Sequence, residues 1–398
     1  MKKIKSIIYV LIVFMSTGIL AESKYYSKIN GNNIVVVKDG IVEEEIPEVT
    51  NFEEIGCNLY NCLAIANNRL YGVGYNLNKV FGNIEVKKYE KWIYIEGMDG
   101  VTHLSVETNN SYIVKNGKIY GSGYNYKGQL GYTGSTDAVL GWKLIEGLED
   151  VSEIKAGYNS VYALKGGKLY SLGDNTSGQL GRNGYTDSDK WGIVSGYSNI
   201  AKLKVTGSSV YIKVGNSIYS VGHNMYGQLG RNGTVKNNTF GVITGINNIA
   251  DLYGGRYNLF VKVSGDLYGI GINTQGQMGL GNKTNQTSFK KISGFTNTVT
   301  EVVGSIYATF IISNGQLYSS GTNSSGVLGR NGGSDDYIFG KVQGLNNVKK
   351  VGVTATSVYV ITEEGLYSFG NNSHGQLGIG NTEGKNEPVK VGLSHLNK

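Results

Sequence analysis

Proline and tryptophan are scarce in this chain, with 2 and 3 copies among 398 residues, whereas glycine occurs 60 times. A disordered linker of such glycine content is usually rich in proline as well, so the composition argues against that class. Abundant glycine without proline favours many tight turns, as an all-β repeat protein needs. The 29 tyrosines also suit β-strands.

A strong charge of either sign is missing too. The formal net charge is +7, but three of the lysines lie within the first five residues, so the rest of the chain is only mildly basic. We therefore expect no nucleic-acid partner. The four histidines have neither HxxxH nor HExxH spacing and no Cys/His ligand pattern. The sequence thus predicts no metal site, no cofactor and no catalytic centre.

The first 21 residues are typical of an export signal. Lys2, Lys3 and Lys5 precede an apolar run from Ile7 to Leu20, and Ala21 offers a small residue for cleavage. The run is short for a membrane span, which needs about 20 residues. The sequence predicts a signal peptide at 1–21, no stable membrane anchor after cleavage, and a secreted, periplasmic or cell-surface protein. An uncleaved anchor is the alternative.

Only two cysteines are present, Cys57 and Cys62, on either side of a short predicted turn. Export makes a disulfide chemically possible, and the short turn makes closure conceivable. However, the two cysteines align with Ala156 and Val161 of a later repeat. This alignment favours two small buried apolar side chains over a disulfide.

The dominant feature of the sequence is a segment that recurs along the chain. Its copies are RLYGVGYNLNKVFG at 69–82, KIYGSGYNYKGQLG at 118–131, KLYSLGDNTSGQLG at 168–181, SIYSVGHNMYGQLG at 217–230, DLYGIGINTQGQMG at 266–279, QLYSSGTNSSGVLG at 316–329 and GLYSFGNNSHGQLG at 365–378. The glycine before the variable residue and Asn returns every 49 or 50 residues. Such a period indicates a repeat architecture.

Each copy divides into four short strands. Around Gly173 the pattern predicts strands at Val151–Ala156, Val161–Lys165, Lys168–Gly173 and Trp191–Ser195, with a tight turn at Gly166-Gly167. No sustained helical periodicity is present. We therefore predict an all-β, seven-bladed β-propeller over 41–398, with four antiparallel strands per blade. Residues 22–40 form an N-terminal segment, and Ile41–Pro47 resembles a strand that meets the C-terminal strand to close the ring.

The residues that recur in the repeated segment can each be given a role in building the fold. The glycines allow backbone angles closed to other residues. Asn125 and Asn175 can cap the turn with their amides, and Gln129 and Gln179 can bond loop backbone groups. The leucine that follows, such as Leu180, can tuck between neighbouring blades. Since one binding site rarely needs the same residue in every repeat, we expect these residues to build the fold.

The GxNxxGQLG loop, the period and the number of copies resemble the regulator of chromosome condensation (RCC1) repeat family. The resemblance covers the chain from about residue 41. It implies a propeller and, for the family's best-known activity, guanine-nucleotide exchange on a nuclear GTPase with attachment to chromatin. The His-Thr pair common at the family's first turn is absent from every copy, and the first copy reads NKVFG at 78–82. Secreted bacterial propellers of similar blades include inhibitors of secreted enzymes.

Residues that break the repeat are the candidates for binding. Strand order places the first turn and the long signature loop of every blade on one face of the disc. Tyrosine and arginine are enriched in interface hot spots. The predicted partner-binding residues on this face are Tyr60, Tyr158, Arg256, Tyr257, Tyr307, Tyr124 and Tyr226. The alternative is that these tyrosines only reflect a tyrosine-rich chain. Arg182, Arg231 and Arg330 occupy equivalent GRNG positions, which favours a structural role for them.

The sequence as a whole predicts an exported, monomeric, non-enzymatic scaffold that binds a protein, or alternatively a glycan, through its loop face. One alternative is an inhibitor of a secreted enzyme. Another, which follows from the family resemblance, is a guanine-nucleotide exchange factor for a GTPase, although export would separate such a factor from a nuclear partner.

Overall fold

The computed structural model describes residues 25–30, 33–38, 41–47, 52–76, 79–82, 88–132 and 139–392. The predicted signal peptide and His395 lie outside the described residues. The chain divides into two compact units, Met1–Thr50 and Asn51–Lys398. The boundary predicted at residue 41 falls at the first residue of a strand of the smaller unit.

The smaller unit is a three-stranded antiparallel sheet of β1 (Tyr25–Asn30), β2 (Asn33–Lys38) and β3 (Ile41–Pro47). Lys38 of β2 pairs with Ile41 of β3. The strand expected to help close the ring, β3, pairs with β2 instead.

The larger unit consists of antiparallel sheets whose strands follow one another in sequence order. The first strands are β4 (Glu54–Cys57), β8 (Val101–Glu107), β12 (Glu153–Gly157), β16 (Ile200–Thr206), β20 (Ile249–Gly254), β24 (Val299–Gly304) and β28 (Val348–Val353). The second strands are β5 (Asn61–Ala66), β9 (Asn110–Lys115), β13 (Ser160–Lys165), β17 (Ser209–Val214), β21 (Asn258–Val263), β25 (Ala308–Ser313) and β29 (Ser357–Thr362).

The third strands carry the start of the recurring segment, and the fourth strands lie outermost. The third strands are β6 (Arg69–Tyr75), β10 (Lys118–Gly123), β14 (Lys168–Gly173), β18 (Ser217–Gly222), β22 (Asp266–Gly271), β26 (Gln316–Gly321) and β30 (Gly365–Gly370). The fourth strands are β7 (Lys88–Asp99), β11 (Val139–Glu149), β15 (Ser188–Ile193), β19 (Asn237–Val242), β23 (Gln286–Thr296), β27 (Asp336–Lys341) and β31 (Lys385–Lys390). A 3-10 turn, η1 (Ser324–Gly326), lies in one signature loop.

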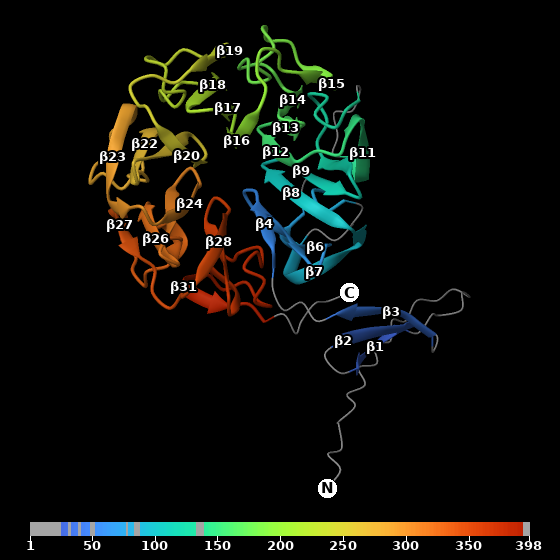
Figure 1. Cartoon of the computed structure of the whole chain (residues 1–398). Coiled ribbons are helices and arrows are strands. Elements are labelled where there is room, and N and C mark those ends of the chain that lie inside the picture. The colour runs from blue at the N-terminus through green and yellow to red at the C-terminus, as the bar shows by residue number, and fades with distance from the viewer. Residues whose placement is uncertain are drawn as a thin grey trace. The chain divides into compact units, whose positions relative to one another are not determined.

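The first strands are arranged around a common axis, which makes the larger unit a propeller (Figure 1). Each first strand contacts the first strand of the next sheet, and β28 contacts β4. The ring therefore closes through β28 and β4, while the last strand, β31, pairs with β30. The sheets that begin with β20 and β24 are also joined by one parallel pairing, Gly254 with Val303. The all-β propeller fold is thus confirmed.

The sheet around Gly173 shows how closely local patterns determined the strands. The second and third strands match the prediction within one residue, because Gly166 and Gly167 both adopt positive φ in the hairpin turn between them. The fourth strand begins three residues earlier than predicted, at Ser188, which pairs with Gly173 across a bulge. The bulge takes up the irregular end of the long loop.

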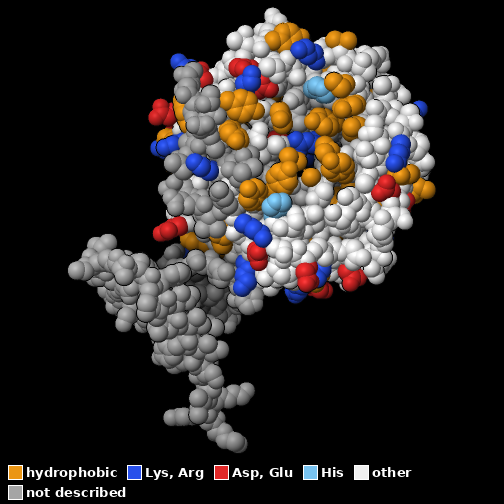
Figure 2. All heavy atoms as spheres, turned by 180° about the vertical axis from the view of Figure 1, so that it is seen from behind, with side chains coloured by type: hydrophobic (Ala, Val, Ile, Leu, Met, Phe, Trp, Pro, Cys, Tyr) orange, Lys and Arg blue, Asp and Glu red, His pale blue; other side chains and the backbone are white. Residues whose placement is uncertain are grey.

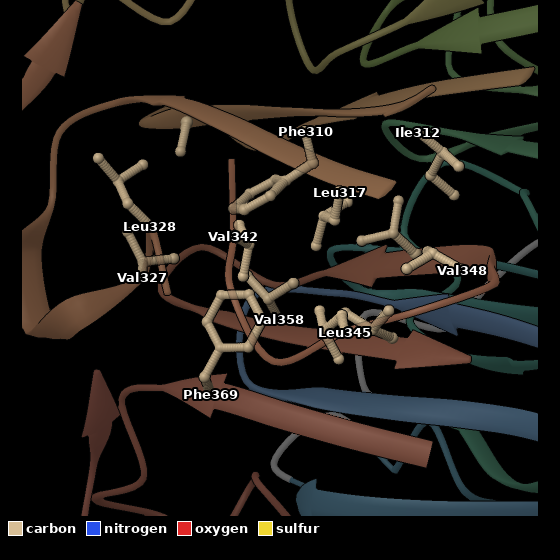
Figure 3. Close-up of a cluster of buried hydrophobic side chains, with 13 residues drawn as sticks. Phe310, Ile312, Leu317, Val327, Leu328, Val342, Leu345, Val348, Val358 and Phe369 are labelled. Atoms are coloured by element: carbon tan, nitrogen blue, oxygen red, sulfur yellow. The ribbon is translucent and has the colours of Figure 1, made fainter. Parts of the chain in front are cut away.

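The hydrophobic core lies between neighbouring sheets. Figure 3 shows one such layer, where Phe310 and Leu317 of one sheet face Val358 and Phe369 of the next, with Leu328 of the signature loop beside them. All of these side chains are buried. Since each sheet buries both faces against its neighbours, the strands read as nearly continuous apolar runs, such as the fully buried β29.

Candidate functional site

One hydrogen bond of the Asn side chain recurs in every signature loop, and a second bond forms in the copies that carry the Gln. The Asn side-chain oxygen accepts the backbone N–H five residues later, at 2.7 Å for Asn125 and Leu130 and at 2.9 Å for Asn175 and Leu180. The Gln side-chain oxygen accepts a backbone N–H two residues earlier, at 2.8 Å for Gln179 and Ser177. The predicted capping roles of Asn and Gln are confirmed.

The sequence did not reveal a buried tyrosine in the second strand that also supports these loops. The Tyr162 hydroxyl donates to the Gln179 carbonyl at 3.1 Å, and the Tyr211 hydroxyl donates to the Gln228 carbonyl at 2.9 Å. Leu180 packs beside Tyr162 and Val210, between two sheets, as predicted. Repeated residues therefore form the base of each loop.

The first turns and the signature loops share one end of each sheet, which we call the loop face. A backbone hydrogen bond joins the two loops: Tyr75 N–H donates to the Tyr60 carbonyl at 3.1 Å, and Thr322 N–H donates to the Tyr307 carbonyl at 3.0 Å. Glycine is needed where the loops meet. An added Cβ at Gly173, which has φ of 108°, would lie 2.5 Å from the Asn159 carbonyl oxygen. The predicted placement on one face is confirmed.

The predicted binding residues differ in exposure. Tyr60 and Tyr158, at the tips of first turns, are 46% and 38% exposed. The others, Tyr124, Tyr226, Arg256, Tyr257 and Tyr307, are half-buried. A further tyrosine of the signature loops, Tyr126, is 43% exposed and had not been among the predicted binding residues.

Several of these aromatic side chains form clusters at the junctions between sheets. Each cluster combines the signature loop of one sheet with the first turn of the next. Tyr226 and Tyr257 lie 5.6 Å apart between ring centroids, and His223 lies within 6.2 Å of both. His374 lies 5.9 Å from Tyr60. The sequence did not indicate these contacts, since it did not show which loops become neighbours in the ring.

His223 is held in its neutral form within its cluster. Its Nδ1 atom accepts a hydrogen bond from the Gln228 amide at 2.8 Å. Burial lowers the pKa of His223 below its usual value of 6.5, and the nearby Lys236 ammonium lowers it further. This histidine contributes an aromatic surface rather than a charge at neutral pH.

Arg256 is less free to bind a partner than the sequence suggested. Its guanidinium forms an ion pair with Glu107 at 3.2 Å and donates to the Thr108 hydroxyl at 2.6 Å. Both partners come from the other side of the axis, 148 and 149 residues earlier in the chain. The side chain is only 16% exposed. Arg256 thus ties two sheets together across the mouth of the axial cavity.

The GRNG arginines have the structural role that their equivalent positions suggested. The guanidinium groups of Arg182, Arg231 and Arg330 lie against the outer-strand glycines Gly192, Gly241 and Gly340, where an added Cβ would collide with them. Arg330 also forms an ion pair with Asp336 at 2.7 Å. These arginines hold the long loops on the outer strands.

Cys57 and Cys62 form a disulfide, which corrects the interpretation as two unbonded apolar residues. The alignment with Ala156 and Val161 gave the correct positions in the sheet. Cys57 and Cys62 face each other directly across β4 and β5, as Ala156 and Val161 do in their own sheet. Residues in that arrangement lie close enough to be bridged. The disulfide closes the first turn that carries Tyr60, and Asn58 accepts the Tyr60 N–H at 2.9 Å.

A hollow opens at the centre of the loop face. Figure 2 shows a face on which hydrophobic side chains gather around a central hollow, with histidine and Lys or Arg side chains among them. The axial cavity at this end has a volume of about 390 Å³ and is lined by residues of the first strands and first turns, among them Asn58, Glu107 and Arg256. Aromatic side chains commonly line the hollows in which proteins bind their ligands.

The described part of the chain contains no group of three or more His, Cys, Asp or Glu side chains that could hold a metal ion. Nor does any helix in that part have the length and apolar character needed to cross a membrane.

Comparison with known proteins supports the same architecture. The family model for the regulator of chromosome condensation (RCC1) repeat matches residues 363–397. Prp20p from Saccharomyces cerevisiae, described with its binding properties to Gsp1p and histones, has a TM-score of 0.72 at 17% identity, covering 84% of this chain and 87% of Prp20p. No curated protein matches the sequence.

Two further solved structures have the same fold. Yeast RCC1 (Prp20) in its complex with Kap60 gives a TM-score of 0.71 at 16% identity, covering 87% of this chain and 86% of that one. Human WBSCR16 gives 0.68 at 17% identity, covering 78% and 86%. The resemblance to the RCC1 repeat family and its propeller fold is therefore confirmed.

Proposed function

We propose that this protein is an exported, non-enzymatic scaffold that recognises a protein partner through its loop face. The observation that carries the proposal is the set of exposed tyrosines on that face, Tyr60, Tyr126 and Tyr158. Tyrosine offers a large, rigid contact surface with a polar tip, and it is enriched among residues that dominate binding energy. Hydrogen bonds anchor the signature loop of Tyr126 and the first turns of Tyr60 and Tyr158 before a partner arrives, which lowers the entropic cost of binding.

The folds of the solved relatives support a protein rather than a glycan as partner. Prp20p is described with its binding properties to Gsp1p and histones, and a second structure shows Kap60 bound to the same propeller. At 16–17% identity the likeness extends to the fold alone, so it does not identify the partner of this chain. A glycan and a secreted enzyme that the scaffold inhibits are the alternative occupants of the same face.

A pull-down from the culture medium and from the cell envelope tests the proposal. The bait is the chain from residue 22 onward, compared with a variant carrying Tyr60→Ala, Tyr126→Ala and Tyr158→Ala. The control variant carries Leu144→Ala, Ile193→Ala and Val242→Ala, which removes equally exposed apolar side chains from the outer strands. We expect the wild type and the control to retain a partner that the tyrosine variant loses.

The partner identified in this way is then purified and titrated against the three proteins. Removing one hot-spot tyrosine costs about 2 kcal/mol, or about thirtyfold in affinity. Equal affinity of the wild type and the tyrosine variant would show that the loop face is not the binding surface. Finding the chain only in the cytoplasm would instead revive the exchange-factor alternative.

A further inference from the structure

The axial channel of the propeller contains a belt of charged side chains at its middle. Two cavities lie along the axis, one of about 390 Å³ towards the loop face and one of about 520 Å³ towards the opposite face. Four residues line both cavities: Lys155 of β12, Lys204 of β16, Glu301 of β24 and Lys350 of β28. We call these four residues the axial belt. They come from four different sheets and are separated by up to 195 positions in sequence.

The charges of the axial belt do not balance, since it has three ammonium groups and one carboxylate. Lys155 has a partner of its own, Glu153, at 3.2 Å. Among the described residues, no acidic oxygen lies within 4.0 Å of the Lys204 or Lys350 ammonium. Glu301 accepts a hydrogen bond from the Val351 N–H at 3.3 Å. The belt therefore offers two cationic groups without a direct acidic partner.

The Lys204 side chain lies against Gly254 of the neighbouring first strand. An added Cβ at Gly254 of β20 would lie 2.9 Å from Lys204 Cε, so glycine leaves the space that the lysine stem occupies. Burial lowers the pKa of Lys204 and the Lys155 ammonium lowers it further, while the Glu301, Glu153 and Asp251 carboxylates raise it. Burial raises the pKa of Glu301, while the Lys204 ammonium opposes that rise. Both charged groups have lost water, and none of these carboxylates lies within 4.0 Å of the Lys204 ammonium, so a bound anion would supply the direct partner that this lysine lacks.

We propose that the axial belt binds a small oxyanion group of the phosphate or sulfate class between Lys204 and Lys350. Lysine binds such groups as a flexible point charge, and a charge-assisted hydrogen bond in a partly desolvated site is stronger than one in water. The two cavities leave room for an inorganic anion or for a small molecule that carries the anionic group. This proposal is independent of the loop-face partner.

Titration of the purified chain with inorganic phosphate tests the site, with chloride replaced at constant ionic strength. Calorimetry should detect saturable binding to the wild type. Lys204→Met should weaken this binding by about tenfold or more, since it removes one charge-assisted contact. Glu301→Gln should strengthen it, because the substitution removes the one negative charge of the belt. Lys168→Met, in an exposed hairpin, is the matched control and should bind like the wild type.

Two additional arms keep the outcome decisive. Lys204→Arg retains the charge and should retain binding, which separates loss of the site from loss of the fold. Glucose 6-phosphate in place of phosphate distinguishes the source of the anion: tighter binding points to a phosphorylated small molecule, and equal binding points to the free ion. If phosphate gives no more heat or thermal stabilisation than chloride, or if Lys204→Met and Lys168→Met both bind like the wild type, the proposal is wrong.

Discussion

The base of each signature loop consists largely of residues that recur in the repeat, whereas its exposed surface consists of residues that differ between copies. At the base, the Asn makes the same contact in every loop and the Gln and Leu recur in most of them, as Asn175, Gln179 and Leu180 illustrate. At the surface, the equivalent positions differ: Tyr126, Thr176 and Met225 each follow the loop Asn in successive loops. The repeated residues are buried, whereas Tyr126 and Met225 are exposed. The comparison separates residues that hold the propeller together from residues available to a partner.

Truncating a base residue should have the largest effect on stability. Leu180→Ala leaves a cavity between two sheets and should lower the free energy of unfolding by about 3 kcal/mol. Chemical denaturation measures this loss. Leu144→Ala, on an exposed outer-strand position, serves as the control and should cost less than about 1 kcal/mol. Similar losses at the two leucines would contradict the division between base and surface.

Loss of a capping amide should have the next largest effect. Asn175→Ala removes the hydrogen bonds to the Leu180 N–H and to the Gly184 carbonyl, at 2.9 and 3.0 Å. Since both groups are then left without this partner, we expect a loss of about 2 kcal/mol by the same denaturation assay. Asn346→Ala, at an exposed position, should change stability by less than about 0.5 kcal/mol. If Asn175→Ala left the free energy of unfolding unchanged, the amide would not stabilise the turn.

Opening the disulfide should also have an effect of about 2 kcal/mol, because the bond closes a short loop and limits the unfolded chain only modestly. Cys57→Ser together with Cys62→Ser should lower the melting temperature, and added reductant should lower that of the wild type to the same value. The reductant should leave the double variant unchanged. A wild type that is insensitive to reductant even when its thiols become reactive would show that the bond does not stabilise the first turn.

His223 should give the pH dependence of the loop face. Its pKa is lower in the folded protein than in the unfolded chain, since burial disfavours the imidazolium. The unfolded state then binds more protons below about pH 6.5, so stability should fall as the pH falls through this range. Titration by NMR should place the His223 pKa below 6.5, and His223→Gln should reduce the loss of stability between pH 7 and pH 5. A His223 pKa above 6.5 would overturn the assigned burial.

The exposed tyrosines should have the smallest effect on stability. Tyr158→Ala should change the free energy of unfolding by less than about 0.5 kcal/mol, because the side chain lies at the tip of a turn. Thermal melts of Tyr60→Ala and Tyr126→Ala should agree with this result. A loss of more than about 1 kcal/mol at any one of them would place that tyrosine among the framework residues.

The propeller fold could be predicted from the sequence alone because turn glycines and short strand patterns recur at a fixed period. Local chemistry also predicted the Asn and Gln roles, since both act within one loop. It failed wherever distant segments meet. The pairing of Arg256 with Glu107, the neighbours of His374 and the closure of the ring through β28 and β4 all depend on contacts across sheets. The disulfide was missed because alignment compares residue types and not the distance between facing strands.

The central claim is that a partner binds the surface of the loops while the repeated base stays unchanged. Hydrogen exchange of the chain with and without the partner found by pull-down tests it most directly. We predict slower exchange in the first turns that carry Tyr60 and Tyr158 and in the signature loop of Tyr126, with the outer strands β15 and β19 unchanged. Slower exchange confined to β15 and β19, with the first turns unaffected, would contradict the claim.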